Sequence, residues 1–251
     1  MKIISWNVNG IRAVYKKNFS GWLTRSLADI VCLQEIKAQK NQIPPDLLAP
    51  ADYLVYVNPA RRKGYAGTLI YTKQKPNRIK INLDLRRFDS EGRILELHYP
   101  RFILINLYLP HGGRQKENLD YKLQVYKCLL RYLKRLKDKK VVLIGDFNIA
   151  HQEIDLARPK DNQNNTMFTS LEREQIDKII ALGFTDTFRE LHREGGSHYT
   201  WWPYFYNARS RNLGWRIDYA FISKPLAPHL KKAFILPKVM GSDHCPIGIE
   251  I

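Results

Sequence analysis

Short apolar runs separated by polar turn residues recur along the whole of this 251-residue chain. The runs at 2–8, 101–110 and 141–149 are rich in β-branched and aromatic residues and are bounded by Asn, Asp, Gly or Pro. This composition is typical of β-strands. Five further runs have the same character, at 29–35, 67–73, 92–99, 216–223 and 246–251. The pattern therefore predicts a protein in which strands dominate.

Three other segments have the spacing of amphipathic helices. The segment 18–28 precedes the strand that begins at Ile30, and the segment 169–183 starts with a Ser/Thr cap and an acidic first turn and ends at Gly183. The segment 119–140 has apolar residues three and four positions apart, at Leu119, Leu123, Tyr126, Leu130 and Leu133. Its basic stretch 131–140 is interpreted as a solvent-facing surface.

The order of these elements favours one domain that spans residues 1–251. No low-complexity segment, long linker or shift of composition divides the chain. Strands outnumber helices, and the runs 93–99 and 102–109 are expected to pair as a hairpin. The mixture predicts an α/β fold with two sheets packed face to face and helices outside, rather than a single parallel sheet.

Charge narrows the choice of partner. The chain contains 41 Lys and Arg against 24 Asp and Glu, which gives a net charge of +17. Such an excess favours a polyanionic partner, with nucleic acid first and an anionic membrane second. No apolar run is long enough for a membrane-spanning helix, and the N-terminus has no signal-peptide pattern. Three scattered cysteines fit reduced thiols, so we expect a cytoplasmic protein.

Polar side chains stand at the ends of many predicted strands. They are Asn7, Asn9, Glu35, Tyr108, Asp146, Asn148, Asp218, Asp243 and His244. Strand alternation places Asp146 and Asn148 on one side, so these groups can converge at one edge of the core. A site rich in carboxylate and amide oxygens and poor in thiolate favours Mg²⁺ or Mn²⁺ over zinc. Together with the basic charge, it predicts hydrolysis of a phosphodiester.

Seven stretches carry a resemblance to a known family. They read SWNVNGIRA, LQEIK, EGR, NLYLP, GDFNIAHQEIDLARPK, NARSRNLGWRIDY and GSDHCPI, and they extend from residue 5 to residue 247. In this order they resemble the exonuclease III type of apurinic/apyrimidinic (AP) endonuclease, within the endonuclease/exonuclease/phosphatase superfamily. The resemblance implies a four-layered α/β sandwich, with two mixed β-sheets face to face and flanked by helices.

The implied activity is metal-dependent cleavage of duplex DNA on the 5′ side of an abasic site, leaving a 3′-hydroxyl and a 5′-deoxyribose phosphate. Family members often add 3′-phosphodiesterase, 3′-phosphatase or 3′→5′ exonuclease activity. The implied cofactor is Mg²⁺, with Mn²⁺ able to substitute. The expected partner is double-stranded DNA with abasic sites or 3′ blocks, bound by a nucleoid-associated monomer that makes no membrane contact.

The resemblance also implies roles for the residues at the strand ends. Asp146 would orient and deprotonate the attacking water, with Asn148 fixing it. Asp218 would hydrogen-bond His244, which would either bind a phosphoryl oxygen or act as the general base. Tyr108 would contact the phosphate. Glu35 would be the principal ligand of a metal site formed by Asn7, Glu35, Asp146, Asn148, Asp243 and His244.

Residues that contact DNA are implied in the same way. Phosphate contacts would come from Asn9, Arg12, Lys16, Lys17, Arg62, Tyr65, Arg93, Arg114, Asn162, Asn165 and Asn207. A pocket for the flipped abasic sugar would be formed by Trp201, Phe205, Trp215 and Ile217. In relatives another apolar wedge can stand at the position of Phe205.

Other hypotheses stay open at this point. The main alternative is an enzyme that acts chiefly as a 3′→5′ exonuclease on double-stranded DNA. Secreted DNase I-like nucleases, inositol-phosphate phosphatases and sphingomyelinases share the superfamily, but the missing signal peptide and disulfide pattern, the basic charge and the stretch 207–219 disfavour them. A hypothesis of a different class is a catalytically inactive nucleic-acid-binding module. A nicking assay on abasic DNA separates it from an enzyme.

Overall fold

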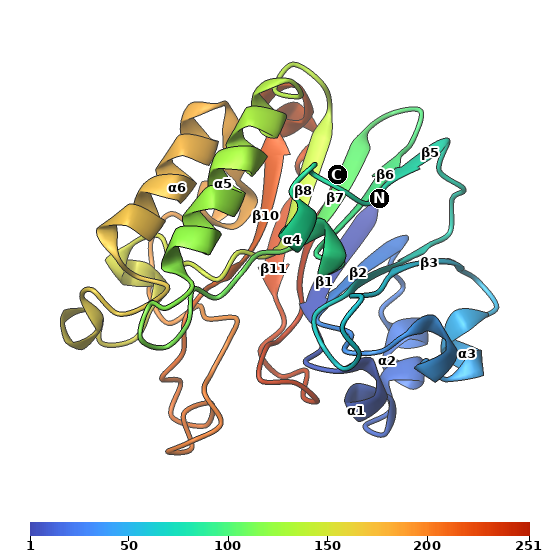
Figure 1. The fold of residues 1–251 in the computed structure, drawn as a ribbon, viewed down its shortest axis with the longest axis horizontal. Coiled ribbons are helices and arrows are strands. Elements are labelled where there is room, and N and C mark those ends of the chain that lie inside the picture. Colours follow the sequence, from blue (N-terminus) through green and yellow to red (C-terminus); the bar gives the residue numbers. More distant parts are fainter.

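Two six-stranded sheets form the centre of the molecule (Figure 1). The computed structural model describes all residues from 1 to 251. The first sheet has the order β11 (Lys232–Ile235), β12 (Ile247–Glu250), β1 (Lys2–Asn7), β2 (Ile30–Gln34), β4 (Thr68–Thr72) and β3 (Leu54–Asn58). The second has the order β5 (Arg78–Lys80), β6 (Ile94–His98), β7 (Ile103–Tyr108), β8 (Val141–Asp146), β10 (Asp218–Ser223) and β9 (Phe184–Asp186). Both are mixed, since β1 with β2 and β7 with β8 are parallel pairs and the others are antiparallel.

Helices cover the outer face of each sheet. The first sheet carries α1 (Ile11–Tyr15), α2 (Phe19–Arg25) and α3 (Pro45–Leu48). The second carries α4 (Arg86–Ser90), α5 (Leu119–Lys134) and α6 (Ser170–Ala181), and α7 (Thr187–Leu191) packs against β10 and β11. Four short 3-10 turns complete the chain, at Lys40–Gln42, Glu153–Asp155, Pro159–Asn162 and Lys224–His229. The predicted four-layered α/β sandwich is confirmed.

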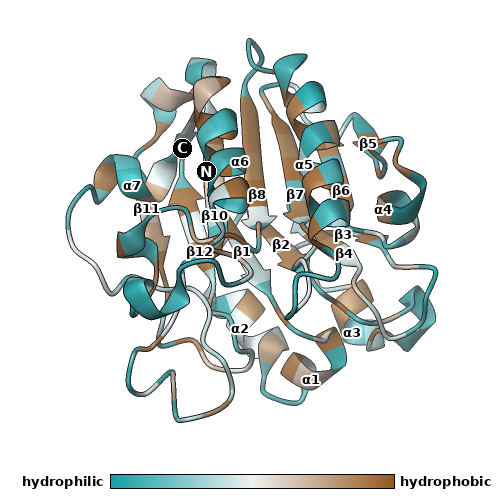
Figure 2. Ribbon diagram, turned by 60° about the vertical axis from the view of Figure 1, so that its left-hand side comes forward, coloured by the Kyte–Doolittle hydropathy of each residue, from teal (hydrophilic) through white to brown (hydrophobic).

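Alternation along each strand separates three apolar layers. On β1, Ile3 packs between the two sheets, whereas Ile4 and Trp6 pack under the first group of helices. On β8, Leu143 faces α5 while Val142 and Ile144 face the other sheet. Successive strand residues point to opposite faces, so one strand serves two layers. Figure 2 shows hydrophobic strands enclosed by helices whose outer turns are hydrophilic. None of the helices combines the length and apolar character needed to cross a membrane.

All eight predicted strands are present, and the predicted hairpin is the antiparallel pair β6 and β7. The four strands that the pattern did not reveal are β3, β5, β9 and β11, and each is an edge strand of its sheet. Edge strands here are short or half-exposed, so they have no continuous apolar run. Their absence from the prediction therefore has a physical cause.

The buried face of α5 differs from the predicted one. Tyr126 and Leu133 are buried as expected, but the other buried positions are Lys122, Val125 and Leu129. Leu119, Leu123 and Leu130 are only partly buried. The difference arises because the helix packs against both the second sheet and α6, so its contact face is wider than one apolar stripe. The predicted start of α6 is confirmed, since the Thr169 side chain accepts a hydrogen bond from the Glu172 amide.

The topology brings the polar strand ends to one end of the sandwich. β1 and β2 run parallel, as do β7 and β8, so their carboxyl ends lie at a common edge. β10 runs antiparallel to β8 and begins there, with Asp218 directly opposite Asp146. Gly145 allows the close approach of β8 to β7, because a Cβ there would lie 2.0 Å from the Leu107 carbonyl oxygen and its φ is +144°. The edge therefore assembles side chains that are far apart in sequence.

Candidate active site

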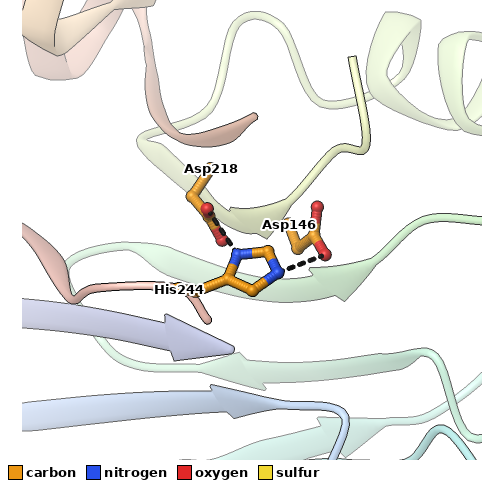
Figure 3. A group of neighbouring side chains, drawn as sticks. All are labelled: Asp146, Asp218 and His244. Atoms are coloured by element: carbon orange, nitrogen blue, oxygen red, sulfur yellow. Dashed lines mark hydrogen bonds and ion pairs between the residues drawn. The ribbon is translucent and has the colours of Figure 1, made fainter. Parts of the chain in front are cut away.

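A histidine held between two carboxylates forms the deepest part of this edge (Figure 3). His244 Nδ1 lies 2.8 Å from Asp218 Oδ2, and Nε2 lies 4.0 Å from Asp146 Oδ2. All three side chains are at least 95% buried. This group, here called the relay, thus combines a hydrogen bond at Nδ1 with an ion-pair contact at Nε2.

The environment sets the protonation of this relay. Burial, followed by the charge of Asp218, raises the pKa of Asp146 to about 7. Burial alone would lower the pKa of His244, but Asp218, through its charge and hydrogen bond, raises it to about 10. The imidazole is therefore a cation at neutral pH, while Asp146 can take up or release a proton there. This is the arrangement that a general base needs.

Two asparagines hold Asp146 in place. Asn7 Nδ2 donates to Asp146 Oδ2 at 2.9 Å and to Glu35 Oε2 at 3.0 Å. The Asn148 amide donates to Asp146 Oδ1 at 2.8 Å, and its side chain donates to Oδ2 at 3.2 Å. The predicted closeness of Asp146 and Asn148 is thus present, but strand alternation is the wrong reason for it. β8 ends at Asp146, and Asn148 has a left-handed φ of +52°.

A second cluster lies around Glu35, closer to solvent. Lys37 Nζ lies 2.8 Å from Glu35 Oε1 and 2.5 Å from Asn9 Oδ1. Asn9 in turn donates to Asp243 Oδ1 at 2.9 Å, and Trp201 Nε1 donates to Asp243 Oδ2 at 3.0 Å. Glu35 and Lys37 both have left-handed backbones, with φ of +57° and +50°. Such strain in non-glycine residues is common at functional sites.

The sequence analysis did not identify Lys37 as a residue of the site. It lies inside the stretch LQEIK, two residues after Glu35, and a charged residue beyond a strand end has no distinctive pattern of its own. Its backbone turn, rather than its sequence, directs the ammonium at the Glu35 carboxylate.

The Glu35 cluster fits a hard divalent cation. Its donors are carboxylate and amide oxygens, which Mg²⁺ and Mn²⁺ prefer. The Lys37 ammonium already places a positive charge on oxygens of Glu35 and Asn9. In the relay, the buried Asp218 Oδ1 has no hydrogen-bond partner. The neighbouring Cys245 thiol is turned toward the Tyr199 carbonyl and is not part of the donor set. The ligand atoms of Asp146, Asp218 and His244 also lie within 4.8 Å of one another, so the edge contains an acidic cluster able to hold a metal ion.

Tyr108 completes the site, and the position of Arg93 differs from the predicted one. Burial, followed by the charge of Glu35, raises the pKa of Tyr108 well above its usual value, so the residue is a neutral phenol. Arg93 was expected to contact DNA phosphates, but it is only 4% exposed. Its guanidinium donates to the Tyr108 carbonyl at 3.1 Å and the Tyr65 hydroxyl at 2.9 Å, and pairs with Glu91. Arg93 therefore supports Tyr108 from within the protein.

Several of the other expected DNA contacts surround a basic hollow. Arg12, Lys16, Lys17 and Lys37 line a depression of about 640 Å³ beside the Glu35 cluster. Arg62 stacks on Tyr65, with its guanidinium carbon 5.3 Å from the ring centre. Arg114, Asn165 and Asn207 are exposed on other loops, and Asn162 is half-buried and donates to the Arg158 carbonyl. These polar groups face solvent, unlike Arg93.

An apolar cluster adjoins the relay. Trp201, Trp215 and Ile217 pack together as predicted, and Met167 and Phe168 join them from a segment that the prediction did not include. Trp215 is 9% exposed and Ile217 1%, so the cluster is a packed wall. Trp201 forms a backbone bridge to His244, which places this wall beside the relay.

The position of Phe205 also differs from the predicted one. Phe205 is 62% exposed, packs edge-on against Tyr206 and is not among the residues that form the wall. It belongs instead to an exposed aromatic loop with Tyr204 and Tyr206. A wedge at this position would act from the loop tip and not from the wall.

Comparison with known proteins agrees with this geometry. The sequence profile of the Endonuclease/Exonuclease/phosphatase family matches residues 4–244. The chain is 44% identical to an exodeoxyribonuclease of Bacillus subtilis, across all of this chain and 99% of that protein. It is 41% identical to the DNA repair nuclease APEX1 of Danio rerio, across 99% of this chain and 81% of that protein.

Solved structures give the same result. An AP endonuclease from Archaeoglobus fulgidus superposes with a TM-score of 0.91 at 30% identity, covering 99% of this chain and 98% of that one. The 3′ phosphatase NExo from Neisseria, bound to a product DNA hairpin, superposes with a TM-score of 0.91 at 28% identity, covering 100% and 98%. The profile match, the identity over the full chain and the shared fold together show that this chain belongs to the endonuclease/exonuclease/phosphatase family.

Proposed function

We propose that this protein is a DNA-repair nuclease that hydrolyses the phosphodiester on the 5′ side of an abasic site in duplex DNA. The products would be a 3′-hydroxyl and a 5′-deoxyribose phosphate. The observation that carries the proposal is the relay of Asp146, His244 and Asp218, which adjoins the apolar wall at Trp201, while Lys37 links the neighbouring Glu35 cluster to the basic hollow. Relatives named as AP endonucleases and exodeoxyribonucleases support it. Residues 1–251 would act as one catalytic domain in a monomer.

The relay suggests how the proton moves. With a pKa of about 7, the Asp146 carboxylate accepts a proton from a water molecule that Asp146 and Asn148 hold. His244, already a cation, donates from Nε2 to a non-bridging phosphoryl oxygen, and Asp218 keeps its charge. A protonated His244 cannot also be the general base, so the high pKa favours Asp146 in that role. Tyr108 keeps its proton, because its pKa is raised, and donates a hydrogen bond to the phosphate. As the water oxygen bonds to phosphorus, the bond from phosphorus to the 3′-oxygen breaks, and that oxygen takes up a proton from solvent to become the 3′-hydroxyl.

Glu35, with Asn7, Asn9 and Asp243 around it, would hold Mg²⁺, and Mn²⁺ would substitute. When bound, the ion neutralises charge on the phosphoryl oxygens and on the leaving oxygen. His244 is less suited to be a ligand, since it is a cation whose Nδ1 is already hydrogen-bonded to Asp218.

DNA would lie across the basic hollow, with the abasic sugar against the wall. Arg12, Lys16 and Lys17 would bind phosphates, which positions a duplex without reading its sequence. Arg62, Tyr65, Arg114, Asn162, Asn165 and Asn207 would extend this contact. An abasic sugar is smaller than a nucleotide and is already unstacked, so a tight wall of Trp201, Trp215 and Ile217 would select it by size.

Action on 3′ ends is a second candidate activity. It is favoured by the similarity to a Bacillus subtilis exodeoxyribonuclease and to the Neisseria 3′ phosphatase. The same relay would serve, because the bond that is hydrolysed is again the one between phosphorus and a 3′-oxygen.

One assay tests both activities. A labelled duplex with a single abasic analogue is incubated with the protein and Mg²⁺, beside an undamaged duplex with a recessed 3′ end. The proposal predicts a single nick 5′ to the analogue. Shortening of the 3′ end with no nick would make the exonuclease the main activity, and binding without any cleavage would leave a DNA-binding module.

A further inference from the structure

A lysine with no side-chain exposure lies directly behind the catalytic strand. Lys122 on α5 is 0% exposed, as is its partner Glu172 on α6. Its Nζ donates to the Asn148 carbonyl at 2.6 Å, to Glu172 Oε1 at 2.5 Å and to the His111 carbonyl at 3.4 Å. An ammonium group has three N–H donors, and here all three have acceptors. Burial of such a charge is costly unless it is fully paired in this way.

The three acceptors belong to three separate segments of the site. His111 lies in the loop after β7, Asn148 follows β8, and Glu172 lies in the first turn of α6. Glu172 in turn accepts hydrogen bonds from the amides of Met167 and Thr169. Lys122 therefore joins the loop after Tyr108, the catalytic strand end and the segment that supplies Met167 to the apolar wall.

The contact with Asn148 has the most direct consequence. Asn148 has a left-handed φ of +52°, a conformation that is uncommon for non-glycine residues but that asparagine adopts more readily than most. Its carbonyl points back to Lys122, while its amide and side chain point forward to Asp146. Fixing the carbonyl fixes the orientation of the whole residue, and hence of the two donors that hold Asp146.

We propose that Lys122, neutralised by Glu172, is a positioning residue that acts through Asn148 on Asp146. The proposal rests on the function proposed above, in which Asp146 activates the water. The competing explanation is that the pair only stabilises the packing of α5 on α6. The two explanations differ in what happens when both charges are removed together.

The decisive variant is the double substitution Lys122→Met with Glu172→Gln. Removing one partner alone would leave a buried charge unpaired, whereas removing both is often close to neutral for stability. The side-chain oxygen that Glu172→Gln retains can still accept a hydrogen bond from the Thr169 amide, which keeps the start of α6, whereas the Met167 amide loses its acceptor. We expect a melting temperature near that of the wild type, but a single-turnover rate at saturating DNA that falls about 100-fold, as expected for a misplaced catalytic group. DNA affinity should stay almost unchanged.

Lys127→Met, an exposed lysine of the same helix, is the matched control and should keep the wild-type rate. A folded double variant with the wild-type rate would overturn the proposal and leave Lys122 a packing residue. If the double variant does not fold, Lys122→Gln with Glu172→Gln keeps polar groups in the same space. The shorter amide of Lys122→Gln ends short of the Asn148 carbonyl, so the same loss is expected and the same result would overturn the proposal.

Both variants are assayed on the abasic duplex and on the recessed 3′ end. If the wild-type protein cuts only the 3′ end, the proposed AP endonuclease function is wrong. The role of Lys122 is then tested by the rate of 3′-end cleavage, since that reaction would use the same Asp146. Wild-type protein inactive on both substrates would overturn both proposals.

Discussion

The two sheets contribute different halves of the candidate site. The second sheet supplies Asp146, Asp218 and Tyr108, on elements where burial controls protonation. The first sheet and its loops supply Glu35 and Asn9, which lie beside a basic hollow and within reach of solvent. The difference indicates a division of labour. Under the proposed function, the buried half would handle protons, and the more exposed half would handle charge on a metal ion and on DNA.

Only a few side chains cross between the halves. Asn7 leaves β1 to donate to Asp146, and His244 leaves the loop before β12 to reach Asp218. Asn7 also donates to Glu35, so a substitution in either half can change side-chain positions in the other. Substitutions on each side should therefore produce different kinds of defect, and the predictions below test that.

The largest effect should come from removing divalent cations. The Glu35 cluster has no internal group that supplies the charge neutralisation of a divalent ion, because Lys37 carries a single charge. We expect nicking of abasic DNA to fall below detection after EDTA treatment and to return when Mg²⁺ is added in excess. Undiminished nicking in EDTA would show that the exposed half does not have the role assigned to it.

The next effect is in the buried half. Asp146→Asn keeps the shape of the side chain but removes the proton acceptor. We expect the single-turnover rate to fall about 10³- to 10⁴-fold, with DNA binding retained, because the lost interaction is made in the transition state. A binding assay on the same preparation is the control. A near-wild-type rate would assign water activation to another group.

A smaller effect is expected at the apolar wall. Trp215→Ser opens space beside Trp201 and Phe168. The ratio of abasic cleavage to cleavage at normal 3′ ends should fall by about tenfold, since packing against the sugar is lost while the relay stays intact. An unchanged ratio in a folded variant would show that Trp215 has only a structural role.

The smallest effect is expected at Lys37. Its ammonium competes with a metal ion for Glu35, so Lys37→Met should lower the Mg²⁺ concentration needed for half-maximal activity. For a partly exposed pair we expect a change of about fivefold or less. A titration of activity with Mg²⁺ measures it, with Lys40→Met as an exposed control. A higher Mg²⁺ requirement would mean that Lys37 helps to hold the site together instead.

A comparison of the central strands with the edge strands shows how much of the fold could be predicted from the sequence. β1, β7 and β8 are apolar and buried on both faces, so their runs are visible in the sequence. The strand β5 is largely exposed and has no such run. On α5, the buried position Lys122 could not be predicted, because its burial depends on Glu172, which lies 50 residues away.

The site shows the same limit. Asp146, Asp218 and His244 were predictable because their motifs match a family, and the fold brings them together. Arg93 was misplaced, since a charged residue before a strand gives no sign that it turns inward under Tyr108. Phe205 was misplaced because an aromatic residue among other aromatic residues can belong to a wall or to an exposed loop.

The pH dependence of single-turnover cleavage tests the central claim most directly. Activity needs Asp146 without its proton and His244 with one, so the rate should rise with pH up to about 7 and fall again above about 10. Because the charge of Asp218 raises both pKa values, Asp218→Asn should move both limbs to lower pH. A wild-type profile without an acidic limb, or limbs that stay fixed in Asp218→Asn, would contradict the account of the buried half.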